Sequence, residues 1–166
     1  MTAFKHLLVP TDFGDASERA LDVAIEIATK FDATITLLHA TWLPPYYYSA
    51  YAEGLAWPTD ELEGAAGREL AAAVSRARAR YPKVAGKLVP GEPWERILEA
   101  AQEDEADLIV MGTHGRRGVA RAVLGSVAEK TVRMSPIPVL TISDEAMRRE
   151  RQASYAERNP RKAGRP

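Results

Sequence analysis

The chain has 166 residues, a formal net charge of −1 and no cysteine. This length suits one domain of ordinary size with some additional chain. The balanced charge gives no indication of nucleic acid binding, and the absence of cysteine excludes disulfides, cysteine metal sites and thiol catalysis. No segment approaches the roughly 20 apolar residues that cross a membrane, and the N-terminus lacks a signal-peptide pattern. We therefore expect a cytoplasmic protein that binds neither nucleic acid nor membranes.

Short apolar runs alternate with stretches of helical period along the chain, which is typical of βαβ units around a parallel sheet. The first strand is predicted at 6–9 and is followed by a helix. Asp15 and Glu18 have the spacing of a capping box at the start of that helix. The later predicted elements are strands at 34–39, 86–89, 107–111 and 137–142, and helices at 59–80, from Pro93 onward, and at 126–133.

Two segments depart from this rhythm. Residues 41–58 have no clean period and contain a tyrosine cluster between Tyr46 and Tyr51. We interpret them as a long loop whose tyrosines either cover a binding site, form a partner surface or pack over a helix. Residues 144–166 are polar and charged, and we expect them to form a partly disordered C-terminal extension beyond a folded domain of residues 1–143.

The stretch from Gly112 to Ser126 is the most informative part of the sequence. It begins where a buried strand ends and finishes where a helix begins, and ligands bind at such carboxyl ends in open α/β sheets. Glycines there let the backbone approach a ligand, and the first turn of the helix at Ser126 would attract an anion. The same residues also permit a plain turn followed by a helix cap. The stretch is neither a Walker A sequence nor a Gly-x-Gly-x-x-Gly loop.

The spacing of Gly112, Gly115 and Gly125-Ser126 is Gly-x2-Gly-x9-Gly-Ser/Thr, and with it the chain resembles the ATP-binding universal stress proteins. The opening Leu-Val-Pro-Thr-Asp is similar to the same family. The resemblance covers about residues 3–143 and so implies that the folded domain is a universal-stress-type nucleotide-binding domain. It implies an α/β fold with a single open five-stranded parallel sheet, in the order 3-2-1-4-5, and helices on both faces. The nucleotide would lie across the carboxyl ends of the first and fourth strands.

The resemblance also implies site residues and a cofactor, ATP with Mg²⁺ or Mn²⁺. Asp12 would lie near the ribose or bind the metal, and Ala40 would contact adenine through its backbone. The residues expected to contact ATP are Pro10, Thr11, Asp12, Ala40, Met111, Gly112, His114, Gly115, Arg116, Arg117, Gly125, Ser126 and Val127. Asp12 alternatively serves only the turn, the two arginines only a solvated loop face, and His114 only the loop. We expect His39 to be a satisfied histidine at a strand end.

No catalytic-loop pattern with a base accompanies this site, so no catalytic residue is assigned and slow ATP hydrolysis is the most we expect. The preferred hypothesis is a nucleotide-dependent regulatory or stress-response module. The alternatives are a dimeric interaction protein without functional nucleotide binding and a slow ATPase. The strand at Ile137–Ile142 would lie at a sheet edge, and apolar edge strands invite pairing. The family pairs through this strand, which implies a homodimer, while the protein partner is unknown. The alternative is that the charged C-terminal extension covers this edge.

Overall fold

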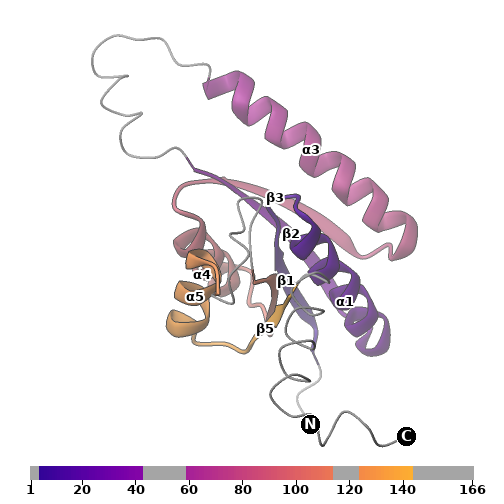
Figure 1. Cartoon of the computed structure of the whole chain (residues 1–166). Helices are drawn as coiled ribbons and strands as arrows, with labels where there is room; N and C mark the ends of the chain where they lie inside the picture. The colour runs from indigo at the N-terminus through magenta and orange to yellow at the C-terminus, as the bar shows by residue number, and fades with distance from the viewer. Residues whose placement is uncertain (1–3, 43–58, 114–123, 144–166) are drawn as a thin grey trace, which may run out of the picture.

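A computed structural model of the chain describes residues 4–42, 59–113 and 124–143. Its elements, in chain order, are β1 (His6–Pro10), α1 (Asp15–Phe31), β2 (Thr34–Thr41), α3 (Thr59–Arg80), β3 (Val84–Pro90), α4 (Pro93–Glu103), β4 (Leu108–Gly112), α5 (Ser126–Met134) and β5 (Val139–Ile142). All strand pairs are parallel, and the order is β3-β2-β1-β4-β5 (Figure 1). The predicted α/β fold and its strand order are confirmed.

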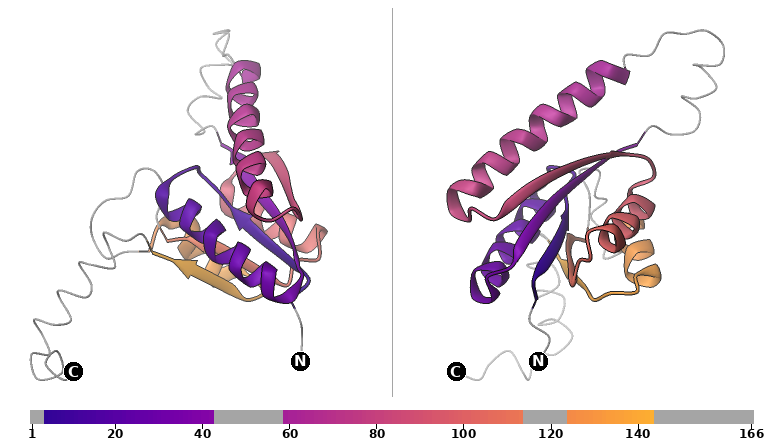
Figure 2. Two further views of the ribbon diagram at one scale, coloured as in Figure 1. Left: turned by 90° about the vertical axis from the view of Figure 1, so that its right-hand side faces the viewer. Right: turned by 180° about the vertical axis from the view of Figure 1, so that it is seen from behind.

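The sheet separates two apolar layers because successive side chains of a strand point to opposite faces. In β1, Leu7 and Val9 belong to the cluster that also contains the buried residues of α1 and α3. Leu8 between them belongs to the second cluster, which contains the buried residues of α4 and α5. The helices therefore cover both faces of the sheet, with α1 and α3 on one and α4 and α5 on the other (Figure 2).

β1 and β4 separate before either strand ends. The last pair in register between them is Leu8 with Ile109. β1 nevertheless continues to Pro10 and β4 to Gly112. This is also the place where the strand order reverses, since the chain moves outward to β2 and β3 and then returns to β4. In doubly wound sheets, such a switch point is where ligands bind.

Several predicted boundaries change in the structure. β2 is longer than predicted and reaches Thr41, while β5 is shorter and begins at Val139. The predicted capping box is wrong, because Asp15 is itself the first residue of α1 and the N-cap is Gly14, with no side-chain cap. The tyrosine cluster and the C-terminal extension lie outside the described residues. Across the described ranges, none of the helices combines the length and the apolar character needed to cross a membrane.

Gly112 ends β4 against the first turn of α1. A Cβ atom added at Gly112 would lie 2.8 Å from both the carbonyl carbon and the Cβ of Ala16. Ala16 is buried, and its backbone cannot retreat without moving the start of the helix. A glycine at this position is therefore required for close packing between the end of β4 and α1, whatever else the residue does.

Replacing Gly112 with alanine tests this packing. We expect the Gly112→Ala protein to unfold with about 1–3 kcal/mol less free energy than the wild type, the usual cost of overpacking. Gly67→Ala is the matched control, since a Cβ there would meet only Leu88 Cδ2, at 3.8 Å, within a helix that gains from alanine. Urea denaturation measures both, and a Gly112→Ala midpoint equal to that of the wild type would contradict the packing role.

Candidate functional site

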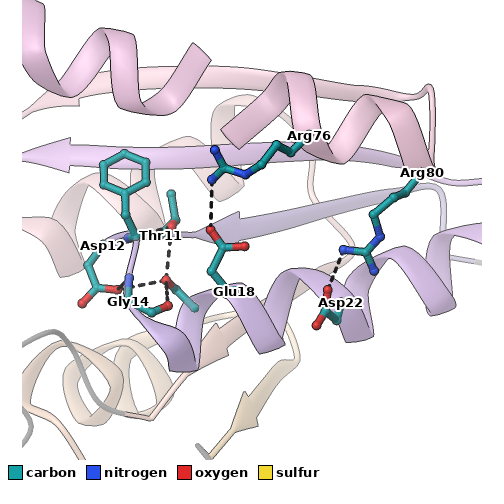
Figure 3. Close-up of polar contacts among 9 residues, drawn as sticks. Thr11, Asp12, Gly14, Glu18, Asp22, Arg76 and Arg80 are labelled. Atoms are coloured by element: carbon teal, nitrogen blue, oxygen red, sulfur yellow. Dashed lines mark hydrogen bonds and ion pairs between the residues drawn. The ribbon is translucent and has the colours of Figure 1, made fainter. Parts of the chain in front are cut away.

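The turn between β1 and α1 forms one side of the candidate site, and Asp12 organises it. Oδ1 of Asp12 accepts hydrogen bonds from the backbone N–H of Gly14 at 3.0 Å and from the Ser17 hydroxyl at 2.9 Å. The carboxylate thus joins the turn to the first turn of α1 (Figure 3). This confirms a turn role for Asp12, and the same picture shows its other oxygen directed away from α1.

Phe13, next in this turn, adopts an unusual backbone conformation. Its φ is 62°, in the left-handed region that bulky residues rarely occupy. Its N–H donates to Thr11 Oγ1 at 3.0 Å, and its ring lies 4.5 Å from that of His39, measured between centroids. A residue held in this region costs of order 1–3 kcal/mol, and such strain concentrates at functional sites. The turn is therefore fixed by contacts that offset a local backbone cost.

His39 contacts the backbone of the same turn. Its Nδ1 lies 2.7 Å from the Thr11 carbonyl oxygen, and because a carbonyl only accepts, Nδ1 carries the proton. The prediction of a satisfied histidine at a strand end is confirmed. Local sequence pattern did not indicate, however, that its partner would be the loop between β1 and α1.

β2 extends past the end of β1, and Ala40 lies in this extension. The last backbone bond between the two segments runs from the Thr11 N–H to the Leu38 carbonyl at 2.8 Å. Alternate residues of a strand direct their backbone groups to the same side. Ala40 lies two residues beyond Leu38, so its backbone N–H and carbonyl point to the β1 side of β2, beyond the point where β1 ends. The Thr11 carbonyl, next along that side, accepts from His39 instead.

The segment between β4 and α5 forms the other side of the site. Thr113 is buried, and its N–H donates to the Ile142 carbonyl at 2.9 Å. Its own carbonyl accepts from the Gly125 N–H at 2.7 Å. This bond holds the start of α5 next to the end of β4, although eleven residues separate Thr113 from Gly125 in the sequence.

The start of α5 carries backbone donors without a side-chain cap. Gly125 is the N-cap, and the first bond of the helix runs from the Glu129 N–H to the Gly125 carbonyl. The N–H groups of the first turn precede that bond and have no partner within the helix. The first turn of α1 carries two carboxylates, Asp15 and Glu18, whereas that of α5 carries one, Glu129. Of these two helix starts, α5 therefore opposes an anion with less negative charge.

A carboxylate with a shifted pKa lies at the opposite end of β4. The backbone N–H groups of Lys5 and His6 donate to Oδ2 of Asp107 at 2.7 and 2.9 Å. These two bonds favour the charged form and hold the pKa of Asp107 below its ordinary value. Asp107 joins the starts of β1 and β4, so its role is structural and separate from the candidate site.

The structure brings the predicted site residues together only in part. Pro10, Thr11, Asp12, Ala40, Met111, Gly112, Gly125, Ser126 and Val127 lie at or near the carboxyl ends of β1, β2 and β4. His114, Gly115, Arg116 and Arg117 lie outside the described residues. Met111 is buried in the α4–α5 cluster, and Val127 packs against the same cluster. The described ranges hold no group of three His, Asp or Glu side chains that would bind a metal ion.

Sequence reasoning missed Ser17. Its hydroxyl contacts Asp12, the Gly14 carbonyl and Thr11, and the residue is 4% exposed. A small polar residue in the first helical turn after an aspartate is a weak signal, which becomes meaningful only when the turn geometry is known.

Comparisons with known proteins identify a family that matches most of the chain. Residues 3–143 match the sequence profile of the Universal stress protein family. Universal stress protein MJ0531 of Methanocaldococcus jannaschii is 35% identical over 140 residues, which cover 84% of this chain and 82% of that protein.

Solved structures share the fold as well. The structure of MJ0577 from the same organism has a TM-score of 0.72 and 27% identity, covering 87% of this chain and 99% of that one. A universal stress protein in complex with cAMP has a TM-score of 0.61 and 30% identity, over 86% and 98% of the two chains. The universal stress protein of Archaeoglobus fulgidus in complex with dAMP has a TM-score of 0.62 and 26% identity, over 85% and 99%. With its profile matched over most of its length and a relative above 30% identity, the chain belongs to the universal stress protein family.

Proposed function

We propose that this chain binds ATP across the carboxyl ends of β1 and β4 and acts as a nucleotide-dependent regulatory or stress-response module in the cytoplasm. The observation that carries the proposal is the start of α5. Its first-turn donors have no side-chain cap, and the bond from Gly125 to Thr113 holds them at the end of β4. Phosphate groups are the natural acceptors for donors in this arrangement.

The conformation of Gly125 adds support. Its φ of −59° and ψ of 150° are open to any residue, so the backbone does not require glycine there. Gly112, in contrast, is accounted for by its contact with Ala16. A residue without a side chain at position 125 would let a phosphate group approach the backbone closely.

Such a site can supply enough binding free energy for micromolar affinity. Hydrogen bonds to a charged group contribute roughly 1.5–3 kcal/mol each. Three or four of them, with partial burial of an adenine ring, reach the roughly 8 kcal/mol of micromolar binding. The backbone groups of Ala40, which point past the end of β1, supply a donor and an acceptor for the edge of the base.

Two observations support ATP as the nucleotide: the ligands of two relatives and the spacing of the glycines. One relative in this family was solved with cAMP and another with dAMP, both of which pair an adenine with a phosphate. The spacing of Gly112, Gly115 and Gly125 resembles that of the ATP-binding members and extends the proposal to the triphosphate. Arg116 and Arg117 are proposed to assist at the phosphates.

We propose that Mg²⁺ or Mn²⁺ binds mainly to the nucleotide, with Asp12 as its protein ligand. Mg²⁺ is commonly bound by one or two carboxylates together with substrate phosphates and water, so a single acid at the site is compatible with it. Asp12 would supply the carboxylate oxygen that is directed away from α1. The ion, when bound, would neutralise phosphate charge.

Regulation is favoured over catalysis because the sequence shows no catalytic-loop pattern that supplies a base. Efficient phosphoryl transfer needs an oriented nucleophile and groups that stabilise the developing charge. Slow hydrolysis remains the alternative activity, and an interaction protein with an empty site is the alternative role.

We also propose a homodimer formed through β5. β5 lies at the edge of the sheet, and its four residues are partly buried. Pro138 directs its carbonyl toward β4, where it accepts from the Ile109 N–H, and Ile142 does the same toward Thr113. By alternation, Val139 and Thr141 direct their backbone groups outward, where a second copy of the strand would pair.

The nucleotide proposal is tested by what the protein carries and what it binds. The purified protein is denatured and the released small molecules are chromatographed, after which the refolded or nucleotide-free protein is titrated with ATP, with and without Mg²⁺. We expect co-purified adenine nucleotide or micromolar binding that Mg²⁺ strengthens. No released nucleotide together with no binding up to millimolar ATP would contradict the proposal.

Gly125→Val tests the phosphate side of the site. Valine tolerates the backbone angles of this position, so the fold should persist with at most about 1 kcal/mol lost from the N-cap. The added side chain blocks the approach of phosphate, and we expect ATP affinity to fall at least tenfold by calorimetry. Gly64→Val, on α3, is the matched control and should bind as the wild type does. Wild-type affinity in Gly125→Val would refute the assignment of this loop.

Thr141→Pro tests the dimer. Proline removes the outward N–H of Thr141 while leaving the bonds of β5 to β4 in place, and edge strands tolerate proline at such positions. Light scattering of the wild type should give twice the 18.2 kDa mass of one chain, and Thr141→Pro should give a monomer. Thr141→Val keeps the N–H and should stay dimeric. A monomeric wild type at micromolar concentration would rule the pairing out.

A further inference from the structure

We propose that Ser17 is a positioning residue for Asp12, holding its carboxylate in the orientation in which it meets the nucleotide ribose or its metal ion. The proposal rests on the proposed function for what Asp12 contacts, but its geometric part concerns Ser17 and Asp12 alone. Ser17 lies in the first turn of α1, one turn beyond the loop that carries Asp12.

The hydroxyl of Ser17 is surrounded by oxygen atoms in a buried place. Ser17 is 4% exposed. Its Oγ lies 2.9 Å from Asp12 Oδ1, 2.8 Å from the Gly14 carbonyl oxygen and 3.2 Å from Thr11 Oγ1. Water has little access to such a group, so its hydrogen bonds are made within the protein.

Proton counting assigns the direction of these bonds. Thr11 Oγ1 accepts the Phe13 N–H at 3.0 Å, so its own proton is available for Ser17. Ser17 has one proton and two acceptors, Asp12 Oδ1 and the Gly14 carbonyl. The Gly14 carbonyl already accepts the Glu18 N–H at 3.0 Å. A carboxylate is the stronger acceptor, so the proton of Ser17 goes to Asp12.

Two donors then meet at the same carboxylate oxygen. The Gly14 N–H and the Ser17 hydroxyl both bond to Oδ1, and two directional bonds to one atom restrict rotation of the carboxylate more than either bond alone. Oδ1 thereby joins the turn, and the other oxygen is directed away from α1 (Figure 3).

A double-mutant cycle tests the inference. ATP affinity, with Mg²⁺ present, is measured by calorimetry for the wild type, Ser17→Ala, Asp12→Ala and the double variant. We expect Ser17→Ala to weaken binding about tenfold, which corresponds to about 1.4 kcal/mol. In the Asp12→Ala background the same change should have no further effect, because Ser17 acts through Asp12. Thr29→Ala removes a hydroxyl that bonds to the Ile25 carbonyl farther along α1, and it should bind as the wild type does.

A second measurement needs no nucleotide. Three-bond NMR couplings between Hα and Hβ of Asp12 report whether its χ1 angle is fixed. We expect the couplings of one rotamer in the wild type and in Thr29→Ala, and averaged couplings in Ser17→Ala. Fixed couplings in Ser17→Ala, or equal affinity losses from Ser17→Ala in both backgrounds, would overturn the positioning role. A wild type that shows the predicted couplings but binds no ATP would instead overturn the proposed function and leave the geometry of Asp12 intact.

Discussion

The early separation of β1 from β4 is the constraint on which the rest of the site depends. The two central strands stop pairing after Leu8 and Ile109, and each then leads into a different helix on a different face of the sheet. The turn that follows β1 carries Asp12, and the segment that follows β4 returns to it at Gly125. Both sides of the site are thus placed by where hydrogen bonding between two strands ends, before any single side chain is considered.

Gly112 and Gly125, the two glycines near this point, have different structural surroundings. Gly112 lets β4 reach α1, because a Cβ there would overlap the backbone of Ala16. Gly125 has angles that any residue can adopt, and we propose that its small size lets a phosphate group approach the backbone. A glycine in a sequence signature can therefore be required by packing, as Gly112 is, whatever its role in binding.

Hydrophobic periodicity was enough to predict the strands and the helices, because buried faces repeat with a fixed period. The order of the sheet came instead from the resemblance to the universal stress proteins. The preference of proline for the first helical position predicted the start of α4 at Pro93, and the predicted start of α5 at Ser126 is also confirmed. The capping box at Asp15 failed because cap geometry depends on the exact helix start, and the N-cap is Gly14, one residue earlier than predicted. The extension of β2 to Thr41 comes from pairing with β3, a tertiary effect that local pattern does not contain. The roles of Ser17 and His39 depend likewise on contacts that form only when the turn after β1 folds.

The central claim is that the start of α5 receives phosphate groups. The most direct test is an NMR titration of ¹⁵N-labelled protein with ATP and Mg²⁺, with the backbone amides assigned. We predict the largest shifts at the amides of Gly125, Ser126 and Val127, with a second group at Ala40, all saturating with one dissociation constant. Saturable ATP binding that leaves the amides of residues 125–127 unmoved would contradict this account of the site.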